Sequence, residues 1–265
     1  MAVTKKNLLK DVIKHIDITK INSLDIIDSM RDMSFSSRDT ARAADILQMM
    51  IKDKDCTNWL TMAGSSSAGG CMQVYVDMVR FNMIDCIVST GASVIDMDFF
   101  EALGYNHYKG TPFVDDGKLR SVYIDRIYDT YIDEEELQHC DATIKTIADS
   151  LEPRPYSSRE FLWETGKWLV KNSVKKESLL QTCYEHGVPV FVPAFSDCSA
   201  GFGLVMHQQE RIRAGKPYVT IDSVADFREL TEIKIKAKTS GLFMIGGGVP
   251  KNFAQDTVVC AECQG

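Results

Sequence analysis

Short apolar runs alternate with amphipathic stretches along most of the chain. Runs of strand length lie at residues 59–62, 85–89, 188–194 and 241–245. Between the first two runs, apolar side chains recur at helical spacing at Met72, Tyr75, Val76, Val79 and Met83. Strands that alternate with helices predict an α/β fold: a Rossmann-like, doubly wound and mainly parallel sheet with helices on both faces.

The first 55 residues show helical patterns. They predict a peripheral helix over residues 1–20, a helix that Ser23 caps, and a helix that begins at Ser37 or Asp39. We therefore expect residues 1–55 to form a helical segment that packs on an α/β domain of residues 56–265.

Local signals place further elements. Residues 104–118 predict a loop, residues 125–130 a short strand and turn, and residues 133–150 a helix. Ser157 and Glu160 form a capping box for the next helix. Gly187 is expected to end a helix over residues 178–186, and two more helices are expected over residues 202–213 and 224–239.

Each long apolar run ends in a turn of small and polar residues. These turns are residues 63–70, 90–93, 195–201 and 246–248. Glycine and serine let a ligand approach the backbone, and the helix that follows presents free N–H groups and a positive dipole end. Because such turns meet at one edge of a parallel sheet, they favour a nucleotide-binding crevice over turns packed for steric reasons alone. The pattern is neither G-x-G-x-x-G nor a Walker loop.

Three charged residues beside these turns are candidates for ligand binding. Asp96 could cap its helix, or it could face a ribose hydroxyl or a substrate amine, and the sequence leaves both interpretations open. Asp197 follows the third strand, where an acid would meet a ribose or an amine. Lys251 lies in the first turn of a helix, where a cation is unfavourable, so its position favours an anionic ligand.

Composition narrows the class of partner. A net charge of −7 argues against nucleic acid and anionic membranes, and it is compatible with a cationic small substrate. No apolar run is long enough to span a bilayer and the N-terminus lacks a signal-peptide core, so a cytoplasmic address is expected. The eight cysteines are expected to be free thiols. Cys260 and Cys263 form a single C-x-x-C motif with no second cysteine pair and no nearby histidine, so no metal site is predicted.

The four turns and the segments between them resemble the deoxyhypusine synthase family from about Ser23 onward. The matching segments are residues 63–70, 82–85 before 89–92, 193–199 and 246–251. The likeness is strongest to the bacterial and archaeal deoxyhypusine-synthase-like branch, in which STGA, GTPFVDD, RIYDT and GGGxPKNF recur.

The resemblance implies an NAD-dependent transferase in a homotetramer. An aminobutyl group would pass from spermidine through an enzyme lysine to an acceptor amine. The acceptor would be a lysine of translation factor 5A, or putrescine in homospermidine-forming relatives. Such chemistry needs a dry nicotinamide pocket and carboxylates that hold the distal ammonium groups of the polyamine.

Family positions carry over to named residues of this chain. Those expected to contact NAD are Gly64, Ser65, Ser66, Ser67, Ala68, Thr90, Gly91, Ala92, Asp96, Asp197 and Gly247. Asp96 and Asn252 are expected to contact the polyamine.

Three family positions differ, and the nucleophile is not assigned. Ile95 replaces a glutamate, Phe202 an aspartate and Asn252 a histidine, so we expect a changed amine substrate or acceptor, with homospermidine-type chemistry as one possibility. The family's lysine segment lies well beyond the glycine turn and has no match, so the domain is expected to be incomplete at its C-terminal side. Lys251 is a weak substitute because it aligns with a second lysine of complete enzymes.

Two alternatives to an aminobutyltransferase are open. One is a non-catalytic NAD-binding or assembly protein that has lost the nucleophile. The other is a generic Rossmann-like oxidoreductase, which the absence of G-x-G-x-x-G disfavours. An incomplete sheet edge also predicts poor solubility.

Overall fold

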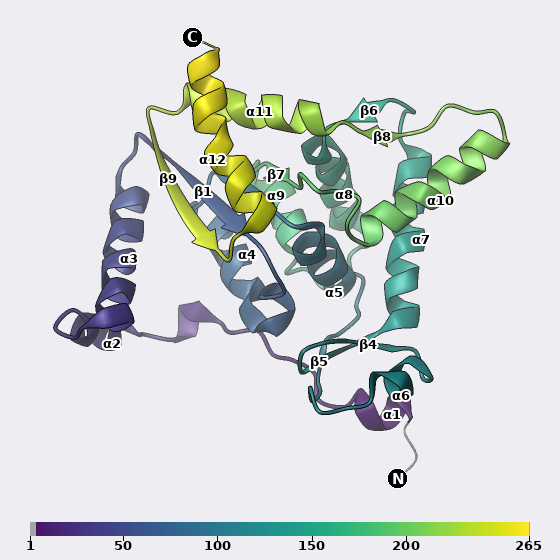
Figure 1. Ribbon diagram of the computed structural model, residues 1–265, viewed down its shortest axis with the longest axis horizontal. Coiled ribbons are helices and arrows are strands. Elements are labelled where there is room, and N and C mark those ends of the chain that lie inside the picture. Colours follow the sequence, from purple (N-terminus) through teal and green to yellow (C-terminus); the bar gives the residue numbers. More distant parts are fainter. Residues whose placement is uncertain (1–3, 265) are drawn as a thin grey trace.

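A four-stranded parallel sheet organises the fold, and the computed structural model describes residues 4–264 (Figure 1). Its strands are β1 (Cys56–Met62), β2 (Cys86–Ser89), β7 (Val190–Phe191) and β9 (Thr239–Ile245). Their order is β7-β2-β1-β9, and every pair is parallel. The predicted α/β fold with a parallel sheet is therefore confirmed.

Helices cover both faces of this sheet, because the side chains of β1 alternate between two apolar layers. Leu60 and Met62 join the larger core, whose helical side chains come from the elements on one face. These elements include α4 (Met72–Arg80), the π-helical η3 (Ala92–Phe99), α5 (Phe100–Ala102), α8 (Ser158–Asn172) and α9 (Leu179–His186). Trp59 points to the other face, where it packs in a second cluster with Leu230 and Ala254. These two residues belong to α11 (Ser223–Lys236) and α12 (Gly248–Cys263).

Two long helices, α7 (Glu134–Ser150) and α10 (Ser199–Arg213), pack against each other beside the sheet (Figure 1). The buried His207 on α10 donates from Nδ1 to Asp149 of α7 at 2.7 Å and accepts from the Val219 N–H at 3.0 Å. That second bond holds the strand β8 (Thr220–Ile221), which pairs with β6 (Pro155–Tyr156).

The predicted helix over residues 1–20 is wrong. The structure has α1 (Lys5–Leu8) and a 3-10 turn, η1 (Ile18–Lys20), with extended chain between them. Val12 bridges Tyr108, and the Ile13 N–H donates to the His107 carbonyl at 2.9 Å. Hydrogen bonds to distant backbone thus replace those that a helix would have made locally. Residues 1–3 of the predicted helix lie outside the described residues.

The N-terminal segment joins a small antiparallel sheet on one side. That sheet contains β3 (Tyr108–Lys109), β5 (Thr130–Asp133) and β4 (Ile124–Ile127), with α6 (Asp116–Arg120) beside it. The predicted 104–118 loop therefore contains β3, and the predicted short strand is β4. Lys5 of α1 forms an ion pair with Asp133 at 2.7 Å.

The other two N-terminal helices are α2 (Leu24–Met30), which begins directly after Ser23 as predicted, and α3 (Phe35–Lys52), which begins before the predicted Ser37 or Asp39. Ser23 makes no side-chain cap, and Asn22 Oδ1 instead accepts from the Leu24 N–H at 3.0 Å. α3 lies beside β9 and β1.

Several predicted boundaries are confirmed, and others shift. Ser157 and Glu160 form the capping box of α8, and Gly187 ends α9 with a φ of 73°. β7 covers two residues of the predicted run 188–194, whereas β9 begins two residues before its predicted run.

No helix among residues 4–264 combines the length and apolar character that a membrane crossing requires.

Candidate functional site

The sheet order places a topological switch point between β1 and β9. From β1 the chain moves to β2 and then β7 on one side, and it returns to β9 on the other side of β1. Ligands of open α/β sheets bind outside the carboxyl ends of the strands at such a point. The Ala63 N–H donates to the Ile245 carbonyl at 2.9 Å, which holds the two glycine turns side by side.

The turn after β1 combines a solvent-accessible backbone with fixed hydroxyls. Gly64 has a φ of 81°, which a side chain would strain, and no atom lies within 4 Å of a Cβ placed there. Ser66 Oγ is hydrogen-bonded to Tyr75 Oη at 2.6 Å, and the buried Ser67 Oγ donates to the Ser93 carbonyl at 3.4 Å. Ala68 is buried in the same turn, and Ser65 is half-buried. The serines therefore rigidify the turn while Gly64 leaves room for a ligand.

The turn after β2 contacts both the first turn and the turn after β7. Ser93 Oγ donates to the Gly64 carbonyl at 2.7 Å, and the Thr90 N–H donates to the Met62 carbonyl at 3.1 Å. A Cβ at Gly91 would overlap Cys198 Sγ, so only glycine permits this approach. Ala92, the first residue of η3, is half-buried. The structure thus brings the predicted turn residues of three strands together.

Asp96 caps a helix, but not its own. Its Oδ1 accepts from the Ser199 N–H at 2.8 Å, so it caps α10, which begins 103 residues later in the chain. Burial raises the pKa of Asp96, the Ser199 hydrogen bonds oppose that shift, and the charge of the exposed Asp197 adds to it. A carboxyl in this setting gains stabilisation from any cation that binds beside it.

Asp141 on α7 is an acid at this site that the sequence analysis missed. Burial and the charge of Asp96 raise its pKa, while a hydrogen bond with Ser199 opposes the shift. Its Oδ1 is shielded from solvent and makes no hydrogen bond within residues 4–264. The residue belongs to a helix far from the strand-end turns in sequence, and no local signal marks it.

The N-terminus of α12 is open to an anion. Gly247 is its N-cap residue, no side chain caps it, and a Cβ at Gly247 or Gly248 would meet no atom within 4 Å. Lys251 is half-buried in this region. In contrast to α10, whose N-terminus the Asp96 carboxylate occupies, α12 keeps its positive dipole end and free amides for a ligand.

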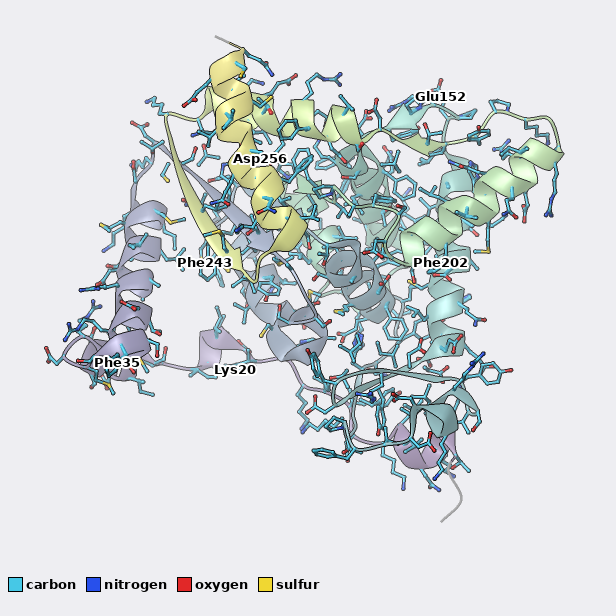
Figure 2. The ribbon with its side chains drawn as sticks, in the orientation of Figure 1. Lys20, Phe35, Glu152, Phe202, Phe243 and Asp256 are labelled. Atoms are coloured by element: carbon cyan, nitrogen blue, oxygen red, sulfur yellow. The ribbon has the colours of Figure 1, made fainter. Side chains whose placement is uncertain are left out.

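The three divergent positions lie in different settings. Ile95 is buried in the main core, whereas Asn252 is exposed. Phe202 is 67% exposed near the start of α10 (Figure 2). Phe202 therefore adds an apolar side chain to the surface of α10 rather than filling the core.

Neither the described cysteines nor other potential ligands form a metal centre. Cys260 and Cys263 lie in the last turns of α12. No three His, Cys, Asp or Glu side chains gather as a metal site between residues 4 and 264.

Comparison with known proteins gives consistent matches. Residues 25–264 match the sequence model of deoxyhypusine synthase. A deoxyhypusine synthase-like protein from Caulobacter vibrioides is 67% identical over 262 residues, which are 98% of this chain and 71% of that protein. One from Coxiella burnetii is 61% identical over 266 residues, which are 100% of this chain and 75% of that protein.

A solved structure gives the same fold. The crystal structure of a deoxyhypusine synthase homologue from Entamoeba histolytica superposes with a TM-score of 0.63, over 89% of this chain and 80% of that chain. The two sequences are 18% identical, so the likeness concerns the fold alone.

Proposed function

Because the chain belongs to the deoxyhypusine synthase family, we propose that it binds NAD and transfers an aminobutyl group from spermidine or a related polyamine to an acceptor amine. The acceptor is a lysine of a protein such as translation factor 5A, or putrescine, which would give homospermidine. The observation that carries the proposal is the convergence of small-residue turns at the switch point between β1 and β9. A homotetramer is part of the proposal.

The residues present fit a dinucleotide. The open space at Gly64 and at Gly247 lets a ligand approach both turns, and the uncapped N-terminus of α12 with Lys251 suits a pyrophosphate. We assign NAD contacts to residues 64–68 and 90–92, to Asp96 and Asp197, and to Gly247. When bound, NAD supplies a hydride acceptor beside the carbon that carries the reacting amine.

The chain's own acids hold the polyamine. Asp96 and Asp141 are partly shielded from water, and the pKa of each is raised by burial and by neighbouring acid. An ammonium group between them would favour their ionised forms and would be positioned by both carboxylates. Asn252 is the further residue that we assign to the substrate, and Lys251 is better placed to bind an anion than to act as nucleophile.

Two measurements test the proposal. NAD binding is followed by calorimetric titration, and the release of 1,3-diaminopropane is followed after incubation with NAD and spermidine. Binding with release supports an aminobutyltransferase. Binding without release supports a non-catalytic NAD-binding protein, and no binding at millimolar NAD contradicts the proposal.

A further inference from the structure

The segment of residues 11–16, which we call the strap, connects the small antiparallel sheet to the candidate NAD site. At one end the Lys109 N–H donates to the Asp11 carbonyl at 2.7 Å, and Val12 bridges Tyr108. At the other end the chain continues through η1, where Figure 2 labels Lys20, to α2. The strap is therefore anchored to the small antiparallel sheet at its first end.

The strap holds the downstream end of the turn after β1. The Ile16 N–H donates to the Gly70 carbonyl at 2.9 Å. Gly70 has a φ of 103°, and a Cβ there would lie 3.0 Å from the Lys14 carbonyl oxygen, so strap and turn are in close contact. The adjacent Gly69 and Cys71 N–H groups donate to the backbone carbonyls of Ser65 and Ser66, respectively. The position of Gly70 thus constrains the turn in which Gly64 to Ala68 are candidate cofactor contacts.

A charged cluster fastens the strap beside this contact. His15 Nε2 donates to Glu101 Oε2 at 2.7 Å, and the buried His107 donates from Nδ1 to Glu101 Oε1 at 2.7 Å. Lys175 Nζ lies 4.0 Å from Glu101 Oε2. Glu101 therefore joins the strap, α5 and the segment before β3.

The contacts of His15 with Glu101 favour the protonated form of its ring. Burial opposes the charged ring, but the Glu101 hydrogen bond and charge outweigh it and raise the pKa of His15 above 6.5, and the Gly70 carbonyl contributes. His15 Nδ1 makes no hydrogen bond of good geometry to that carbonyl. Burial also opposes the ionised Glu101, yet the two histidines lower its pKa to about 2.

Other charged groups surround His15. A cavity of about 530 Å³ beside it is also lined by Asp98 and Glu101 and by Lys175, Lys176 and Glu177. The adjoining groove adds Lys14, Asp17 and Lys20 of the N-terminal segment and Asp77 and Arg80 of α4. Lys175 opposes protonation of His15, and Glu101 outweighs it.

We propose that His15 is a positioning residue for the candidate NAD site: its charged ring, held by Glu101, fixes the strap on Gly70 and so orders the turn of residues 64–70. A group whose pKa is raised by folding contributes stability below its unfolded pKa, and that contribution is lost as the pH rises through the folded pKa. The turn is therefore more ordered at pH 6 than at pH 9. The consequence for NAD affinity rests on the proposed function, whereas the ordering of the turn does not.

Hydrogen exchange tests the ordering directly. Protection factors, corrected for intrinsic exchange, are measured for the Ile16, Gly69 and Cys71 amides at pH 6 and pH 9. The wild-type chain is compared with His15→Gln and with His186→Gln, a control that changes an exposed histidine at the end of α9. NAD affinity is titrated under the same conditions.

The expected result is a loss of protection by about tenfold or more at pH 9, the size that follows from losing a charged hydrogen bond. His15→Gln should show the low protection already at pH 6, and His186→Gln should match the wild type. Equal protection of Gly69 and Cys71 in the wild type and His15→Gln at pH 6 would overturn the inference. If the amides respond as expected but no form binds NAD, the inference stands and the proposed function fails.

Discussion

Asp98 shows how a single buried acid can serve an element far away in sequence. Its carboxylate accepts from Ser178 Oγ at 2.8 Å and from the Leu179 and Leu180 N–H groups at 2.7 and 2.9 Å. It thus caps α9 from within η3. Burial raises the pKa of Asp98 to about 6, although these hydrogen bonds oppose the shift.

This raised pKa predicts a pH dependence of stability. Between about pH 4 and pH 6 the folded state binds the proton more tightly, so the free energy of unfolding falls as the pH rises. A shift of the Asp98 pKa from 3.8 to about 6 corresponds to a fall of about 2–3 kcal/mol in the free energy of unfolding. Asp98→Asn should lack this fall. Urea unfolding at pH 4, 5, 6 and 7 measures the free energy of unfolding of the wild type and of Asp98→Asn. If the two free energies change with pH in the same way, Asp98 is not the source of the pH dependence.

Asp141 offers a residue-scale test of the polyamine site. Asp141→Asn keeps the shape of the side chain and removes one charge near Asp96. We expect spermidine to bind about fivefold to tenfold more weakly, the effect of losing one charge-assisted contact, with NAD affinity unchanged.

The matched control for Asp141 is Asp256→Asn, which removes an exposed charge on α12 (Figure 2). Calorimetric titrations with spermidine and with NAD compare both variants. Equal spermidine affinities of Asp141→Asn and Asp256→Asn would place the substrate elsewhere.

At the scale of elements, the α7–α10 contact determines where Asp141 and Ser199 meet. The two helices approach closely at Gly203, where a Cβ would lie 2.6 Å from the Asp141 carbonyl oxygen and 2.9 Å from Ile144 Cβ. A side chain at this position would push α10 away from α7, and with it Ser199 away from Asp141.

Gly203→Ala should therefore destabilise the protein, even though alanine is the better helix former. The gain in helix propensity is about 1 kcal/mol, and the overlap should exceed it and leave a net loss of about 1–3 kcal/mol. Gln209→Ala, an exposed change on the same helix, should stay within about 0.5 kcal/mol of the wild type. Denaturant unfolding measures both, and a Gly203→Ala protein as stable as the wild type would show that the helices can separate freely.

At the scale of the molecule, the main sheet has an open edge at β9. Among the described residues, β9 pairs with β1 alone, and its other side carries no strand. Exposed apolar side chains lie nearby, including Met244 on β9 and Val258 and Val259 on α12. A long unpaired edge with apolar neighbours favours association between chains, so poor solubility stays a prediction that can be tested at β9.

Met244→Lys should reduce that association. Met244 is 44% exposed, so a lysine can reach water from β9, and its charge opposes edge-to-edge pairing. We expect the soluble fraction after expression to rise about twofold or more, with lower light scattering. Val174→Lys adds the same charge at a position that is 71% exposed after α8, away from β9, and should have little effect. Similar gains from both variants would attribute the effect to net charge instead.

The strand–turn–helix order, the small-residue turns, the capping box at Ser157 and the end of α9 at Gly187 follow from the amino-acid sequence alone. These features depend on neighbouring residues, because apolar periodicity, glycine conformation and capping act within a few positions of the chain. The family resemblance likewise follows from short segments in a fixed order.

Contacts between residues that are distant in sequence become defined only when the chain folds. The local pattern of residues 11–16 predicts a helix, but this strap is extended because its backbone groups bond to those of Lys109, His107 and Gly70. Asp96 and Asp98 cap helices more than 75 residues away along the chain, as their bonds to Ser199 and Leu179 show. Asp141 meets Asp96 because α7 packs on η3 as well as on α10. No local window of sequence contains both members of such pairs, so the chain must fold before they are defined.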